Sequence, residues 1–112
     1  MVTRRPFIIA VLSLITLSGC NTPSASSTDS MDRIQALQTM GRSGHEQDVP
    51  RILPSLSSED PLVRWTAQRT LVTLTGTTNG YDWAADRLDR ASAIEAWVKW
   101  CKDRGLTPPE AR

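Results

Sequence analysis

The sequence predicts an all-α fold, a short α-solenoid of about four helices arranged as antiparallel helix pairs. Three observations lead to this prediction. Apolar residues recur at helical spacing in four segments between residues 29 and 105. Several residue types recur at a constant offset of 31 positions, a period typical of repeat proteins whose stacked helices share one core. Aspartates precede all four segments, and aspartate is a preferred residue at the beginning of a helix.

The first predicted helix begins at Asp29, whose side chain can accept hydrogen bonds from the free backbone N–H groups of the first turn. Its apolar stripe consists of Ile34, Leu37 and Met40. Glycine is the most common residue just after a helix, so this helix is expected to end at Gly41 or at Gly44.

The second predicted helix begins at Asp48-Val49-Pro50. Its buried face is expected to consist of Val49, Ile52, Leu53 and Leu56. Pro54 lies inside this segment and removes a backbone donor, so it is expected either to kink the helix or to end its regular part early.

The third predicted helix begins at Asp60-Pro61 and ends at Gly76. Proline fits the first helical position because the backbone N–H there has no partner within the helix. The apolar stripe of this helix consists of Val63, Ala67, Leu71 and Leu74.

The fourth predicted helix runs from about residue 86 to residue 104 and stops at Gly105. Its apolar face is expected to consist of Ala91, Ile94, Trp97, Val98 and Cys101. A longer loop precedes this helix and contains the turn signal Asn79-Gly80.

The repeat at an offset of 31 relates the first and third predicted helices. The matched pairs are Asp29 with Asp60, Arg33 with Arg64, Ala36 with Ala67, Thr39 with Thr70, and Met40 with Leu71. The segment Asp60-Pro61-Leu62-Val63-Arg64, followed by Ala67 and Leu71, resembles the first helix of a HEAT-like repeat. Residues 33–56 resemble the unit before it, although the start of that unit lacks the proline and valine of the pattern. Residues 76–100 resemble a closing element of some bacterial HEAT-like proteins. The resemblance covers residues 29–105 and implies a scaffold that binds another protein.

The N-terminal segment is typical of a secretory signal peptide, which we expect to be helical. Arg4 and Arg5 precede an apolar run at residues 7–17, which is shorter than the 20 or so residues of a membrane span. The following Leu17-Ser18-Gly19-Cys20 resembles the lipobox of bacterial lipoproteins. This resemblance implies cleavage between Gly19 and Cys20, and a lipid on the Cys20 thiol with a further acyl chain, such as palmitate, on the new N-terminus.

The expected organisation therefore has four parts. They are a signal peptide at 1–19, the lipidated cysteine with a flexible tether at 20–28, the helical repeat domain at 29–105, and a C-terminal tail at 106–112. Residues 21–28 are rich in serine and threonine and have no apolar periodicity, as expected of a tether. Asn21 stands where inner-membrane lipoproteins often carry aspartate, so the resemblance favours the periplasmic face of the outer membrane. Residues 3–8 also resemble a twin-arginine signal, but the very apolar core favours the general secretion route.

Charge and cysteine content exclude several classes of function. Cleavage would remove two arginines and leave eleven basic against twelve acidic residues, so no basic patch for nucleic acid is expected. A lipid on Cys20 would leave Cys101 unpaired, and its helical spacing from Trp97 favours burial over a reactive role. His45 is the only histidine, and we predict no metal site and no cofactor beyond the covalent lipid.

Four tryptophans are many for a domain of this size, and we expect them mainly to pack in the core or over its ends. Trp65, Trp83 and Trp100 are the candidates for interaction with a partner, because exposed tryptophan is frequent at protein interfaces. The leading hypothesis is a membrane-anchored adaptor that binds an envelope protein without chemistry of its own. The alternative is binding of cell-wall glycan through Trp83 or Trp100, and homo-oligomerisation is left open.

An envelope hydrolase is the less favoured hypothesis, and we predict no catalytic residue. Asp82 with Asp86, or Asp89 with Glu95, could be drawn as a carboxylate pair. Acids at such positions are more often helix caps or solvated ion pairs. His45 lies in a polar turn that supplies no oriented base.

Overall fold

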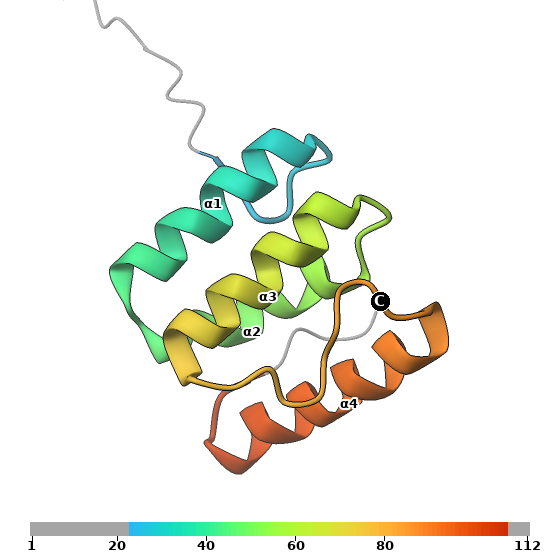
Figure 1. The fold of residues 1–112 in the computed structure, drawn as a ribbon. Coiled ribbons are helices and arrows are strands. Elements are labelled where there is room, and N and C mark those ends of the chain that lie inside the picture. Colours follow the sequence, from blue (N-terminus) through green and yellow to red (C-terminus); the bar gives the residue numbers. More distant parts are fainter. Residues whose placement is uncertain (1–22, 108–112) are drawn as a thin grey trace, which may run out of the picture.

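The computed structural model describes residues 23–107, and this part of the chain is helical without any strand. The all-α prediction is thereby confirmed for these residues. The predicted signal peptide, its cleavage site at Gly19 and the lipidation site at Cys20 lie outside the described residues. The elements are α1 (Ser30–Ser43), the 3-10 helix η1 (Glu46–Asp48), α2 (Val49–Ile52), the 3-10 helix η2 (Leu53–Ser57), α3 (Pro61–Thr75) and α4 (Arg87–Asp103) (Figure 1).

Helices α1 and α3 lie side by side and run in the same direction, and the continuous segment α2–η2 runs the opposite way behind α3 (Figure 1). Helix α4 packs against α2–η2. Its first residue, Arg87, pairs with Glu59 just before α3, and Arg104 after its end pairs with Glu46 just before α2. Helix α4 therefore runs parallel to α3. The predicted antiparallel arrangement is found between α2–η2 and the helices that it contacts, but α3 and α4 are parallel. They are parallel because the loop 76–86 leads the chain back from the end of α3 to the level of its beginning before α4 starts (Figure 1).

The two aspartates of the repeat have the same structural role. Asp29 accepts a hydrogen bond of 2.8 Å from the backbone N–H of Met31, and Asp60 accepts one of 2.9 Å from Leu62. Both predicted N-termini are confirmed. Of the two ends considered for the first helix, Gly44 is the correct one, since it adopts the left-handed conformation with φ of 71°.

Pro54 ends the regular part of the second helix early, as one of the two alternatives predicted. The α-helical hydrogen bonding of α2 stops at Ile52, and residues Leu53–Ser57 continue as the 3-10 helix η2. The predicted buried face of Val49, Ile52, Leu53 and Leu56 is confirmed.

Helix α4 begins after Asp86, whose carboxylate accepts a hydrogen bond of 2.9 Å from the N–H of Asp89. Its buried residues are Ala93, Trp97 and Cys101, whereas Ala91 is exposed, so the inward face is rotated from the predicted one. The reason is the loop before the helix. The Trp97 indole donates to the carbonyl oxygen of Thr78, and four other loop residues lie along the Ala93 side of α4, namely Asn79, Gly80, Asp82 and Ala85, so this side of the helix faces the loop.

A single apolar core joins α1, α2, η2, α3, α4 and the loop before α4. It contains the buried side chains of Ile34, Ala36, Leu37, Met40, Val49, Ile52, Leu53, Leu56, Val63, Ala67, Leu71, Tyr81, Ala93, Trp97 and Cys101. The stripes predicted for the first and third helices are confirmed, with Leu74 only half-buried. Helices α1 and α3 are also joined by a hydrogen bond of 3.2 Å from the Thr70 hydroxyl to the carbonyl oxygen of Leu37.

Residues 23–28 lie against the domain. The N–H of Ser27 donates to the carbonyl oxygen of Ser24 across 3.1 Å, which closes a turn. The Ser27 hydroxyl donates to the carboxylate of Asp32 in α1 across 3.3 Å, and Ala25 packs against the core. This segment, predicted as part of a tether, thus makes specific contacts with the first helix.

Candidate functional site

The loop at residues 76–86 is held by side chains from two directions. The Tyr81 hydroxyl is buried and donates a hydrogen bond of 2.7 Å to the carbonyl oxygen of Leu56 in η2. Burial raises the pKa of Tyr81 above its ordinary value, so the hydroxyl keeps the proton that it donates. On the other side, the indole N–H of Trp97 in α4 donates to the carbonyl oxygen of Thr78 across 3.0 Å. The loop therefore has a defined path between η2 and α4.

The backbone of Trp83 is bound at both of its polar groups by helix α3. Its N–H donates to Oε1 of Gln68 across 2.9 Å, and its carbonyl oxygen accepts from Nε of Arg64 across 3.1 Å. Arg64 and Gln68 are four residues apart, so they lie on one face of the helix, one turn from each other. This pair of side chains positions Trp83 on α3.

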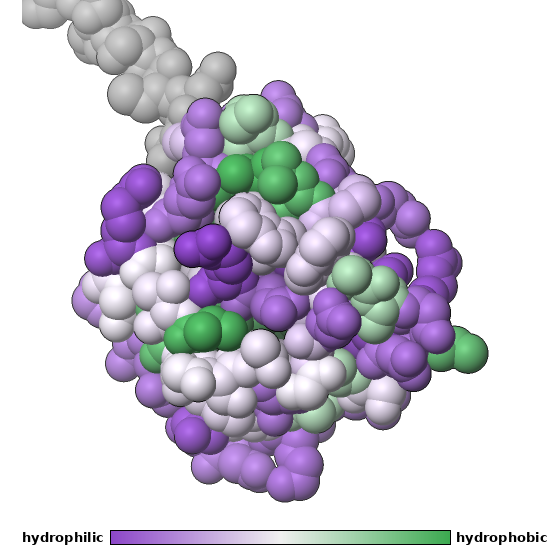
Figure 2. Space-filling model, in the orientation of Figure 1, coloured by the Kyte–Doolittle hydropathy of each residue, from purple (hydrophilic) through white to green (hydrophobic). Residues whose placement is uncertain are grey.

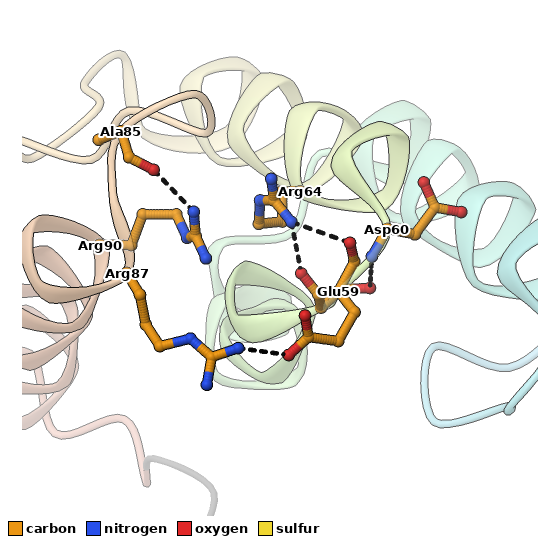
Figure 3. Close-up of polar contacts among 7 residues, drawn as sticks. Glu59, Asp60, Arg64, Ala85, Arg87 and Arg90 are labelled. Atoms are coloured by element: carbon orange, nitrogen blue, oxygen red, sulfur yellow. Dashed lines mark hydrogen bonds and ion pairs between the residues drawn. The ribbon is translucent and has the colours of Figure 1, made fainter.

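The Arg64 guanidinium also binds the turn that precedes α3. Its Nη1 donates to the carbonyl oxygens of Ser58 and Glu59, at 2.8 and 3.2 Å (Figure 3). A single buried side chain thus joins the segments before and after α3. Two arginines of α4 also contact this region. Arg87 pairs with the Glu59 carboxylate at 2.9 Å, and Arg90 donates to the Ala85 carbonyl oxygen at 2.7 Å (Figure 3).

These contacts create an exposed apolar surface at the beginning of α3. Pro61, Leu62, Trp65 and Trp83 line an open hollow of about 390 Å³, and we call these four residues the Trp65–Trp83 surface. Leu62 is 51% exposed and Trp65 is 39% exposed, whereas Trp83 is half-buried and also packs against the core. Met31 occupies the position of α1 that corresponds to Leu62 in the repeat, and it is also exposed. Figure 2 shows apolar side chains gathered where the first turns of α1 and α3 lie next to each other.

The three candidate tryptophans do not form one site. Trp65 and Trp83 come together on the surface just described. Trp100 lies on α4, where its ring meets the edge of Trp97 with centroids 5.4 Å apart and an interplanar angle of 61°. The guanidinium of Arg104 lies 3.8 Å from the centroid of the Trp100 ring and covers one of its faces.

Sequence reasoning missed the residues that build this surface around the two tryptophans. Pro61 and Leu62 were noted only as part of a helix start and a repeat motif, and the role of Gln68 was not predicted. One signal was present, because Arg64 and Gln68 stand at helical spacing on the face next to an apolar stripe. Their partner in the loop could not be inferred from that spacing.

The acids considered for catalysis have structural roles or lie exposed. Asp86 caps α4, and the Asp82 carboxylate accepts a hydrogen bond of 2.9 Å from the N–H of Ala84 within the loop. Asp89 lies in the first turn of α4, where the positive end of the helix dipole stabilises its negative charge. Glu95 and His45 are exposed. Residues 23–107 contain no group of three or more histidine, cysteine or acidic side chains arranged to hold a metal ion.

Cys101 is a free thiol on the buried face of α4. Burial raises its pKa above the ordinary value, an effect that the positive charge of Arg104 opposes in part. Its environment is that of a small apolar core residue.

Within the described part of the chain, none of the helices combines the length and the apolar character needed to cross a bilayer. Comparison of the whole sequence with protein-family models, and of the chain with curated proteins and with solved structures, finds no match.

Proposed function

We propose that this protein is a lipid-anchored scaffold of the cell envelope, whose HEAT-like helical domain binds another protein and carries out no reaction itself. The anchor is inferred from the lipobox-like Leu17-Ser18-Gly19-Cys20, with the lipid on Cys20 and the domain at the periplasmic face of the outer membrane. The binding role rests on one observation, the exposed Trp65–Trp83 surface that Arg64 and Gln68 hold in place.

The HEAT-like interpretation is supported by the equivalence of α1 and α3. Both helices begin with an aspartate cap at the same repeat position, and the helices stack in parallel along their length. Repeat units of this kind bury their apolar faces against neighbours, so a short array needs a closing element. Helix α4 with its buried Trp97 suits that role, since it covers α2–η2 on the side away from α1.

The Trp65–Trp83 surface has the physical properties of a protein-binding site. Large apolar side chains left in water gain free energy when a partner covers them, and tryptophan often contributes most of the binding energy of an interface. The hydrogen bonds that Arg64 donates to Trp83 and that Gln68 accepts from it order the loop before any partner arrives. A preordered site loses less conformational entropy on binding, which raises affinity.

The experiment is co-purification from cross-linked, detergent-solubilised envelopes of cells that make the full chain. We expect Trp65→Ala to lower recovery of the partner at least about tenfold, the effect of a tryptophan hot spot. Val72→Ala is the matched control, because Val72 lies on the same helix and is also 39% exposed. The proposal is contradicted if no protein is enriched. It is equally contradicted if the domain sediments with purified cell wall and Trp65→Ala abolishes that, since this result would assign the surface to glycan.

The anchor is tested separately with a clickable palmitate analogue. Cys20→Ala should abolish labelling of the chain and block its processing, whereas Cys101→Ala should leave both unchanged. Labelling that survives Cys20→Ala would refute the lipoprotein assignment while leaving the binding surface to be judged by its own experiment.

A further inference from the structure

A second hollow continues from the Trp65–Trp83 surface along the face of α1 and α3. It is an open groove of about 530 Å³ between these helices, lined by Gln38, Gly41, Arg42, Trp65, Thr66, Arg69, Thr70 and Thr73. Trp65 lines both hollows and forms the ridge between them. A partner segment that crosses this ridge would therefore meet an apolar site on one side and a polar site on the other.

The groove carries positive charge that the described residues do not neutralise. Its only charged lining residues are Arg42 and Arg69, and neither lies within ion-pair distance of a carboxylate in residues 23–107. Figure 2 shows strongly hydrophilic side chains between α1 and α3 on the face that bears the apolar cluster.

The other exposed arginines of residues 23–107 differ in this respect. Arg51, Arg87 and Arg104 each pair with a carboxylate, at 3.1, 2.9 and 3.2 Å respectively. The two groove arginines instead make contacts that orient them without cancelling their charge. Arg42 donates to the Thr39 hydroxyl across 3.3 Å, and the guanidinium of Arg69 stands 4.9 Å from the centroid of the Trp65 ring.

The three threonines of the groove offer few hydrogen-bond donors to a ligand. The hydroxyls of Thr66, Thr70 and Thr73 already donate to carbonyl oxygens of their own helix, at 2.8, 2.8 and 2.9 Å. Recognition in this groove must then come mainly from the two guanidinium groups, the Trp65 ring and the exposed amide of Gln38. Guanidinium groups bind carboxylates with charge-assisted hydrogen bonds.

From this charge complementarity, and resting on the proposed scaffold function, we propose that the partner contributes an acidic amphipathic segment. An apolar side chain of this segment occupies the hollow beside Leu62, and a carboxylate lies between Arg42 and Arg69. Leu62 and Arg69 are seven positions apart on α3, which corresponds to about 10 Å along the helix axis. The two partner side chains are then about seven residues apart in a helical segment or about three apart in an extended one.

The test places a photo-crosslinking amino acid at Thr73, in the groove, in the full chain produced in its native cells. The matched position is Ser92, which is exposed on α4 and lines a different hollow. We expect a crosslink from position 73 that mass spectrometry maps to a segment of another protein with an aspartate or glutamate next to apolar residues. The double variant Arg42→Glu/Arg69→Glu should lower the yield about tenfold or more, and Lys102→Glu, which reverses an exposed cation of α4 outside the groove, should not.

Charge exchange then decides whether the arginines act directly. Replacing the mapped acid of the partner with arginine should restore the crosslink in the Arg42→Glu/Arg69→Glu background. A crosslink to a second copy of this chain, or a yield that does not respond to the charge changes, overturns the inference. A protein captured only from position 92 also overturns it but leaves the scaffold function standing. If neither position captures any protein, the proposed function fails as well.

Discussion

The Nε of Arg64 donates a hydrogen bond of 3.1 Å to the carbonyl oxygen of Trp83, although the two residues are 19 positions apart. Arg33 is the equivalent arginine of the first repeat unit, and its buried Nε has no hydrogen-bond partner among the described residues. The same residue type thus has different roles in the two units. In the second unit it positions the loop that carries one of the two surface tryptophans.

Arg64→Ala should destabilise the domain by about 3 kcal/mol, because three carbonyl oxygens lose a charged donor in a buried region. Arg33→Ala, at the corresponding position, should cost less than about 1 kcal/mol. Urea unfolding followed by tryptophan fluorescence measures both free energies of unfolding. Equal losses in the two variants would contradict the positioning role assigned to Arg64.

Alanine at Gly41, inside α1, and at Gly44, just after its end, should have opposite effects on stability. Gly41 lies inside the helix, and a Cβ there would meet Cγ2 of Thr70 at 3.6 Å, an ordinary contact. Gly41→Ala should therefore stabilise the protein by about 0.5–1 kcal/mol. Gly44 has φ of 71°, so Gly44→Ala should destabilise it by about 1–2 kcal/mol. Thermal unfolding monitored by circular dichroism shows whether each variant raises or lowers the melting temperature. A higher melting temperature for Gly44→Ala would show that α1 does not end as described.

The carboxylate of Asp60 should make stability depend on pH in the acidic range. The Ser30 hydroxyl and the N–H of Leu62 have the largest effects and lower the pKa of Asp60 below its ordinary value. Desolvation opposes them, and the N–H of Val63 and the charge of Arg33 lower the pKa further. A lowered pKa in the folded state means that the stabilisation is present at neutral pH and is lost as the pH falls below about 4.

Asp60→Asn tests this dependence because asparagine also caps helices but does not titrate in this range. The melting temperature of the wild type should exceed that of the variant near neutral pH, and the difference should shrink below about pH 4. A difference that stays constant across this range would mean that the Asp60 charge does not contribute.

Cys101 should resist thiol reagents in the folded protein. Burial both blocks access and raises the pKa of the thiol, so less of the reactive thiolate is present at a given pH. Alkylation by iodoacetamide should be slow in buffer and rapid in urea. In urea, the mature protein should show one reactive thiol if Cys20 carries lipid and two if it does not, which makes the thiol count an independent check on the anchor.

The sequence was most informative where a local rule decides the structure. The ends of α1 and α3 follow from the capping preferences of Asp29, Asp60, Gly44 and Gly76. The change from α2 to η2 follows from the missing backbone donor of Pro54. These features depend on a few neighbouring residues and need no knowledge of the tertiary fold.

The sequence was least informative where distant segments meet. The direction of α4 and the rotation of its buried face depend on the path of the loop 76–86, which hydrogen bonds to η2, α3 and α4 determine. No sequence pattern indicates where Trp83 lies, whereas the Arg64 and Gln68 contacts place it on α3. Helical periodicity finds a buried face, yet it does not say which segment covers that face.

The contacts of residues 24–27 with α1 affect how far the domain could move from a bilayer. Only three residues would separate a lipidated Cys20 from the turn that begins at Ser24. The distance between the Cα atoms of these two residues is then at most about 14 Å. The whole domain would then stay close to the headgroups, with the edge of α1 that contacts Ser27 turned toward them. Under that geometry, any ligand of α3 must itself approach the bilayer surface, so membrane-bound proteins would be captured in preference to freely diffusing ones.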